Sequence, residues 1–161
     1  MKIIKATKSN IPEIILLNSF VQKIHVNHYP DIFKSSSDKN DITHFYNGIL
    51  EKEENYILVA FKADEAIGYL WAEFQQKPEN PFKYEQKQVY IHQIAVHEQY
   101  RNQKVGYALF NKIEAIAKQN KINNFALDSW IFNTDAHSFF RQIGYETYKI
   151  NMWKREKKKT Y

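Results

Sequence analysis

The sequence contains no cysteine, which excludes a disulfide-stapled fold, a thiol nucleophile and a thiolate metal site. Its longest unbroken apolar run, residues 56–61, has six residues, whereas a helix that crosses a bilayer needs about 20. Only four glycines and four prolines occur in 161 residues, which excludes low-complexity and disordered proteins. Glu13 and Asn18 interrupt the N-terminal apolar stretch, which is not typical of a signal peptide. A cytoplasmic globular protein is therefore expected.

Hydrophobic residues make up 43% of the chain and aromatic residues 16%, enough for one domain with a sizeable core. Residues 154–161 hold five basic residues and one acidic residue, and so carry +4 of the formal net charge of +5. We expect a single, nearly neutral domain over residues 1–153 and a basic C-terminal tail over residues 154–161. The tail is interpreted as a solvated chain end, because a nucleic-acid reader carries its charge on the folded surface. No membrane or nucleic-acid partner is expected.

Hydrophobic periodicity predicts a mixed α/β protein. Alternation and short apolar runs indicate strands over residues 2–6, 56–61, 67–76, 88–96, 125–130 and 145–153. Helical spacing indicates helices over residues 11–27, 41–51, 105–120 and 136–144. Hairpins dominate the first half, whereas a helix joins strands 88–96 and 125–130, which implies a parallel pair. The expected fold is a central mixed, mostly antiparallel sheet with one parallel strand pair, flanked by helices.

The segment from Arg101 to Ala108 lies between the end of an expected strand and the start of an expected helix. The first N–H groups of a helix have no intrahelical partner, and such a terminus binds anions. Gly106 carries no side chain where a phosphate would approach the backbone, and Arg101 and Lys104 add positive charge. The alternative is that Gly106 only lets the helix pack closely.

Two blocks of the sequence resemble the Gcn5-related N-acetyltransferases. The first is IAVHEQYRNQKVGYAL, residues 94–109, and the second is NTDAHSFFRQIGY, residues 133–145. The family signature is Arg or Gln, two residues, Gly, one residue, then Gly or Ala, and it corresponds here to residues 101–106. Lys104 departs from it, since the family usually has its first glycine there. The order of elements also fits, so the resemblance covers about residues 1–153.

The resemblance implies that an acetyl group moves from acetyl-coenzyme A to a primary amine by direct attack in a ternary complex. The coenzyme would lie where the two parallel strands splay apart, with its pyrophosphate on residues 101–108. Its pantetheine arm would pair with Ile94 and Val96 like an added strand, and the Val96 N–H would serve catalysis as an oxyanion donor. The residues implied at the coenzyme are Ile94, Ala95, Val96, Arg101, Asn102, Gln103, Lys104, Val105, Gly106, Tyr107, Ala108, Asn133 and Phe140.

Three of these residues differ from a simple coenzyme contact. Asn133 resembles a coenzyme-contacting asparagine of the family, and a helix cap for the segment from Thr134 is an equal alternative. Phe140 stands where many members carry a tyrosine that protonates the leaving thiolate, so the general acid is not identified. Lys104 could crowd the pyrophosphate, but its ammonium would offset part of the loss, and we expect coenzyme binding to survive.

A general base is needed because an amine is mostly protonated at neutral pH. His92 lies four residues before Val96, and strand alternation puts it on the face of Tyr90 and Ile94. Histidine has an ordinary pKa of about 6.5, which suits the task. The local sequence IHQIAVH also resembles the arylalkylamine acetyltransferases, in which a histidine at this position lies in the proton path. A hydrogen-bonded core residue is the other interpretation of His92. The competing bases on the neighbouring strands are Glu73 and Asp128.

No metal is expected, because the histidines supply no paired set at ligand spacing; they include His25, His28, His44, His92 and His97. The amine acceptor is expected near the first two helices and the loops over residues 28–40 and 77–85. Aromatic residues there line an apolar or cation-binding cleft or belong to the core: Tyr29, Phe33, Phe45, Tyr46, Phe82 and Tyr84.

The leading hypothesis is thus an N-acetyltransferase with a small-molecule or peptide amine as its partner, and a homodimer is compatible with it. Two other classes stay open. A non-catalytic acyl-coenzyme A sensor would keep residues 101–108 and lack the proton-transfer groups, as Phe140 suggests. A nucleic-acid-binding module would depend on the basic tail.

Overall fold

A computed structural model describes residues 1–155 of the chain, which form two compact units, Met1–Asp128 and the residues from Ser129 on. The first unit begins with β1 (Lys2–Lys5), a short 3-10 turn, α1 (Ile11–His28) and α2 (Lys39–Leu50). It continues with β2 (Asn55–Lys62), β3 (Glu65–Lys77), β4 (Gln86–Val96), a second 3-10 turn (Glu98–Tyr100), α3 (Val105–Gln119) and β5 (Phe125–Leu127). The second unit contains α4 (Thr134–Gln142).

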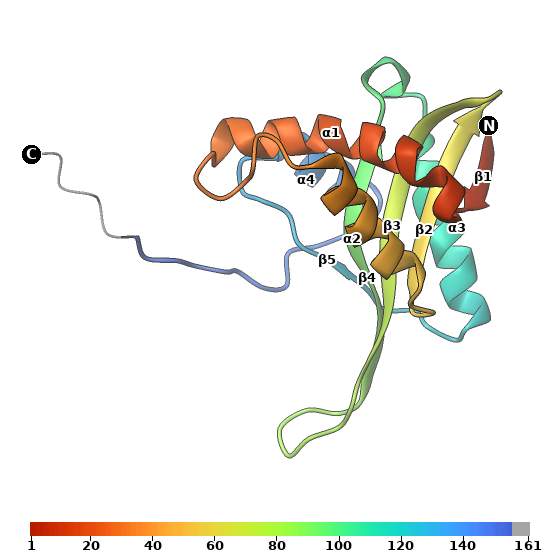
Figure 1. Ribbon diagram of the computed structural model, residues 1–161. Coiled ribbons are helices and arrows are strands. Elements are labelled where there is room, and N and C mark those ends of the chain that lie inside the picture. The colour runs from red at the N-terminus through yellow and green to blue at the C-terminus, as the bar shows by residue number, and fades with distance from the viewer. Residues whose placement is uncertain (156–161) are drawn as a thin grey trace, which may run out of the picture. The chain divides into compact units, whose positions relative to one another are not determined.

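The five strands form one sheet in the order β1-β2-β3-β4-β5 (Figure 1). The first four are antiparallel to their neighbours, whereas β4 and β5 are parallel, in register from Val89↔Phe125 to Ile91↔Leu127. The mixed, mostly antiparallel sheet with one parallel pair is therefore confirmed. β5 ends three residues earlier than the expected strand over residues 125–130, so it covers only a short part of β4.

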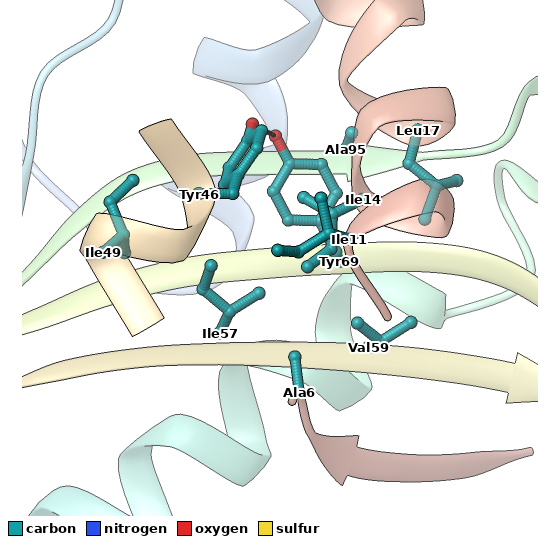
Figure 2. Packing of buried hydrophobic residues seen from close by; sticks show 10 residues of the cluster. All are labelled: Ala6, Ile11, Ile14, Leu17, Tyr46, Ile49, Ile57, Val59, Tyr69 and Ala95. Atoms are coloured by element: carbon teal, nitrogen blue, oxygen red, sulfur yellow. Dashed lines mark hydrogen bonds between the residues drawn. The ribbon is translucent and has the colours of Figure 1, made fainter. Parts of the chain in front are cut away.

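Helices cover both faces of this sheet, with α1 and α2 on one face and α3 on the other (Figure 1). The core under α1 and α2 is shown in Figure 2 and consists of Ala6, Ile11, Ile14, Leu17, Tyr46, Ile49, Ile57, Val59, Tyr69 and Ala95. On the other face α3 buries the side chains spaced along one of its stripes, Val105, Leu109, Phe110, Ile113 and Ala117. The two cores fix the middle of β3 and β4 from both sides.

The far ends of β3 and β4 extend beyond the other strands as a two-stranded ribbon (Figure 1). The last ladder pair between β2 and β3 is Asn55↔Glu73, and β5 reaches β4 only at Val89. Residues 78–85 close the ribbon, and Phe82 in that loop is 93% exposed. None of the helices in residues 1–155 is long and apolar enough to cross a membrane.

The prediction of a closing strand over residues 145–153 was wrong. Apolar side chains do alternate there, and Tyr148, Ile150 and Met152 are exposed. A strand, however, requires a neighbour that accepts its backbone hydrogen bonds, and this segment pairs with no strand within residues 1–155. Of the expected basic tail, residues 156–161 lie outside the described residues.

Candidate active site

β4 contains one extra residue, His92. Opposite β3 the register passes from Trp71↔Gln93 directly to Ala72↔Ile91, so His92 has no partner across the ladder. Such a bulge interrupts the alternation of faces. Because cross-strand partners share a face, Ile94 lies with Leu70 on the α3 face. The expectation that His92 shares a face with Ile94 was therefore wrong, because the bulge shifts the alternation by one residue.

The side chain of His92 contacts three neighbours from β3 and β4. Its ring stacks on Trp71, with 4.3 Å between ring centroids and 22° between planes, and meets the edge of Tyr90 at 5.0 Å. Its Nε2 lies 2.8 Å from Oε2 of Glu73. The two side chains are 28% and 29% exposed. His92 is thus neither a buried core residue nor a freely solvated one.

Glu73, the competing base on β3, is a hydrogen-bond partner of His92. Its Oε2 also accepts a hydrogen bond from Nε2 of Gln75, at 2.9 Å. Burial acts to raise the pKa of Glu73, but the hydrogen bonds from Gln75 and His92 and the charges of His92 and Lys52 outweigh it, so the pKa lies below the ordinary value. The carboxylate therefore stays ionised at neutral pH and becomes neutral only as the pH falls through that lowered pKa.

A buried polar network fixes the residue next to the bulge. The Tyr69 hydroxyl donates to Oε1 of Gln93 at 2.8 Å, and the Tyr46 hydroxyl donates to the same oxygen at 3.3 Å. Burial raises the pKa of Tyr46 and raises that of Tyr69 well above its ordinary value, so both hydroxyls keep their protons. Gln93 is thereby held in place on the face of α1 and α2, and the bulge at His92 is held with it.

The outer edge of β4 is open beyond Ile91. The His97 N–H donates to the Ile67 carbonyl at 2.9 Å, which makes Gly68↔Val96 a non-hydrogen-bonded pair. By alternation Leu70↔Ile94 is a second such pair, so the N–H and C=O groups of Ile94 and Val96 point away from β3. Since β5 pairs only with Val89 to Ile91, no strand within residues 1–155 covers this edge. An extended ligand could therefore add to the sheet here.

The loop that follows this edge has an unusual backbone. Asn102 and Lys104 have φ values of 59° and 61°, in the left-handed region that favours glycine. This left-handed backbone explains why the family signature has a glycine at the position of Lys104. The first hydrogen bond within α3 runs from the Ala108 N–H to the Lys104 carbonyl, so the N–H groups of Val105 to Tyr107 have no partner inside the helix.

Gly68 lets the start of α3 approach the sheet closely. A Cβ atom at this residue would lie 3.0 Å from the Ala95 carbonyl oxygen and 3.0 Å from Cγ1 of Val105. The first turn of α3 therefore packs directly on the part of β3 that faces Val96. Gly68 was not among the predicted site residues, although a glycine inside an expected strand is itself a signal of close backbone approach. The N-terminus of α3 therefore lies next to the open edge at Val96.

The other predicted site residues, Asn133, Phe140 and Asp128, lie outside the bulge and the start of α3. Asn133 caps α4, accepting a hydrogen bond from the Ala136 N–H at 3.4 Å, and Phe140 packs against Tyr145 with 6.1 Å between ring centroids; both belong to the second unit. Asp128 is exposed just past the end of β5.

Among residues 1–155 no group of three or more His, Cys, Asp or Glu side chains could hold a metal ion. Nδ1 of His25 instead lies 2.8 Å from the Val21 carbonyl.

The aromatic residues proposed for the acceptor cleft separate into different environments. Tyr46 is buried in the core, and Phe82 and Tyr84 are exposed on the ribbon loop. Phe33 contacts His25, with 4.7 Å between ring centroids. Phe45 is 54% exposed and lies 6.0 Å from the ring of Trp71, next to His92. Of these five, only Phe45 is therefore placed to contact a molecule bound beside His92.

Lys104→Gly is expected to raise the free energy of unfolding by about 0.5–1 kcal/mol, because relief of a left-handed conformation outweighs the greater entropy of glycine in the unfolded chain. Lys112→Gly is the matched control, since Lys112 lies exposed within α3. That control should instead lose about 1 kcal/mol. Urea unfolding of the three proteins measures both changes. Equal destabilisation by the two substitutions would contradict a strained backbone at Lys104.

Comparison with known proteins gives the family. None of the curated proteins is significantly similar to the chain in sequence. A mutant of protein BH1408 from Bacillus halodurans is 27% identical, with a TM-score of 0.90 over 97% of this chain and 100% of that one. The aminoglycoside 6'-N-acetyltransferase AAC(6')-IG from Acinetobacter haemolyticus is 20% identical, with a TM-score of 0.73 over 98% and 99%.

The aminoglycoside N-acetyltransferase AAC(6')-Iy, solved in complex with CoA, is 16% identical, with a TM-score of 0.71 over 97% of this chain and 99% of that one. The likeness to the two aminoglycoside enzymes is one of fold. The model of the acetyltransferase (GNAT) family matches residues 20–145, which is more than half of the chain. The resemblance noted in the sequence is thus confirmed, and the chain belongs to the GNAT acetyltransferase family.

Proposed function

We propose that the protein transfers an acetyl group from acetyl-coenzyme A to a primary amine of a small molecule or peptide, by direct attack in a ternary complex. One observation carries the proposal: the open edge of β4 at Ile94 and Val96 leads directly into a loop with unpaired N–H groups at the start of α3. The combination of an open strand edge with an anion site suits a ligand with a pantetheine arm and a pyrophosphate.

The residues of this site fit the coenzyme chemically. The outward N–H and C=O groups of Ile94 and Val96 match the amides of a pantetheine arm, as a neighbouring strand would. The N–H groups at Val105 to Tyr107 suit a pyrophosphate, and the exposed side chains of Arg101 and Lys104 add two positive charges. Ala95, Asn102, Gln103 and Ala108 complete the contacts in this unit, while Asn133 and Phe140 are predicted contacts from the second unit.

In the proposed reaction His92 removes the proton of the attacking amine. The Val96 N–H, which points to the open edge, donates to the thioester oxygen as negative charge develops on it. The amine nitrogen forms its bond to the acetyl carbon, and the carbon–sulfur bond breaks. Because Phe140 has no proton to give, the leaving thiolate takes its proton from solvent. No metal takes part in the proposed reaction.

The proposal treats residues 1–153 as one acetyltransferase domain, and the family match over residues 20–145, which spans both compact units, supports this. A cytoplasmic location remains a prediction, as does the absence of membrane and nucleic-acid partners. A homodimer is compatible with the proposal.

Release of free coenzyme A thiol from acetyl-coenzyme A, measured across a panel of amines and peptides, tests the proposal. Turnover on at least one amine, with an acetylated product in the mass spectrum, is the expected result. Coenzyme binding without turnover on any amine would instead favour a sensor, for which the missing hydroxyl at Phe140 is the specific observation. Absence of coenzyme binding would contradict both functions.

A further inference from the structure

We propose that Glu73 is a positioning residue for His92. In this inference Glu73 holds the imidazole in the tautomer with its proton on Nε2, so that Nδ1 is the nitrogen that accepts the proton of the amine. The inference rests on the proposed acetyl transfer and adds to it the identity of the basic atom and the group that selects it.

The hydrogen bond between the two side chains requires this tautomer. Nε2 of His92 and Oε2 of Glu73 are 2.8 Å apart, so a proton lies between them. An ionised carboxylate can only accept, and therefore the proton belongs to Nε2. In a neutral imidazole the other nitrogen is then an acceptor. Within residues 1–155 Nδ1 of His92 has no hydrogen-bond partner, so its lone pair is available to a bound amine.

The orientation of the imidazole is fixed by groups on two sides. Trp71 stacks on the ring, and its own indole N–H donates to Oδ1 of Asn55 at 2.7 Å. Asn55 is 7% exposed, so this anchor is buried. The carboxylate is held by Gln75, whose Nε2 donates to the same oxygen that His92 uses. A ring flip that exchanged the two nitrogens would break the bond to Glu73.

The same surroundings stabilise the charged product of proton transfer. As the amine nitrogen bonds to the acetyl carbon and the thiolate leaves with its electron pair, the proton on nitrogen passes to Nδ1 and makes an imidazolium. That cation lies beside the Glu73 carboxylate and on the face of Trp71, a carboxylate contact and a cation–π contact that both favour it. The imidazolium returns its proton to solvent, which protonates the thiolate, so the reaction balances.

The other charged and titratable groups around the pair come from neighbouring elements. Tyr90 of β4 touches the edge of His92, and Lys52, in the turn before β2, acts on the charge of Glu73. A hollow of about 540 Å³ is bordered by Glu73, Tyr90, Lys77 and Glu54. The hollow gives solvent access beside the pair, so proton return needs no further path.

The first test is the tautomer of His92, read from the ¹⁵N chemical shifts of its ring in the full-length protein. The wild type should show a protonated Nε2 and an unprotonated Nδ1 at alkaline pH. Glu73→Ala should give a mixture of the two tautomers, and Asp64→Asn, which removes a charge from the exposed turn between β2 and β3, should leave the spectrum unchanged. A protonated Nδ1 in the wild type would overturn the inference.

The second test is kinetic. Glu73→Gln should lower kcat by about 10–100-fold with little change in the KM for acetyl-coenzyme A, and Asp64→Asn should not. The acidic limb of the pH profile should change, because the variant lacks the carboxylate that lies beside the base. In a His92→Ala background Glu73→Gln should cost nothing further. An equal loss in both backgrounds would overturn the inference.

These tests separate two kinds of failure. If no amine is acetylated, the proposed function fails, and the ¹⁵N spectra alone still decide whether Glu73 selects the tautomer. If acetyl transfer occurs and the wild type has the expected tautomer, but Glu73→Gln leaves kcat and the pH profile unchanged, the positioning role is wrong while the proposed function stands. Thermal melting of each variant shows that it is folded.

Discussion

His92→Ala is expected to lower kcat/KM for acetyl transfer by about 10²–10⁴ at neutral pH and to leave coenzyme binding intact. The loss follows because in the proposed reaction the imidazole is the proton acceptor for the amine, whereas the coenzyme would lie on the open edge of β4 and on the loop before α3. The gap between the two proteins should narrow at alkaline pH, where more of the amine is already deprotonated. Profiles of kcat/KM against pH for both proteins measure the effect.

His44→Ala is the control for this prediction, because His44 is an exposed residue of α2. It should reproduce the wild-type profile. An unchanged acidic limb in His92→Ala would mean that Glu73, Asp128 or bulk water is the base. In that case His92 would be a packing residue between Trp71 and Tyr90.

Gly106→Val should abolish most of the rise in melting temperature that acetyl-coenzyme A causes. A ligand that binds only the native state stabilises it by about 2.7 kcal/mol at 100 times its dissociation constant, and that contribution disappears when binding does. Gly106 is the second residue of α3, where a pyrophosphate would approach the N–H groups of the first turn. A branched side chain there would keep the phosphates away from those groups.

Gly48→Val separates this effect from the general cost of a substituted glycine in a helix. Gly48 lies within α2, and a Cβ atom there would meet nothing within 4 Å. Both variants change helix propensity in the same way, but only Gly106→Val should lose the response to the coenzyme. Differential scanning fluorimetry with and without acetyl-coenzyme A measures it. A full response in Gly106→Val would show that the phosphate site has been assigned to the wrong loop.

The start of α3 and the order of the elements could be predicted because both depend on local patterns. The first unpaired N–H groups of a helix follow from where the helix begins, and hydrophobic spacing places that start at Val105. The left-handed backbone at Lys104 could not be predicted in this way, since lysine rarely adopts it. Only the missing glycine of the family signature gave a hint of it.

The partnership of His92 with Glu73 could not be predicted, because it depends on register between strands. A bulge adds a residue without changing the alternation of apolar and polar letters around it, so the sequence gives no sign of where the faces shift. The two residues were therefore treated as competing bases. The closing strand failed for a related reason, since alternation over residues 145–153 says nothing about whether a sheet edge is there to pair with it.

The ribbon of β3 and β4 has a consequence for local stability. Its hydrogen bonds join only two strands, and an isolated two-stranded hairpin is marginally stable in water. Amide hydrogens of residues 75–77 and 86–88 should therefore exchange with solvent through local opening, long before those of Ile91 to Val96, which require the whole sheet to open. Proteolytic cleavage in the ribbon loop is therefore expected to occur through this local opening, without unfolding of the rest of the sheet.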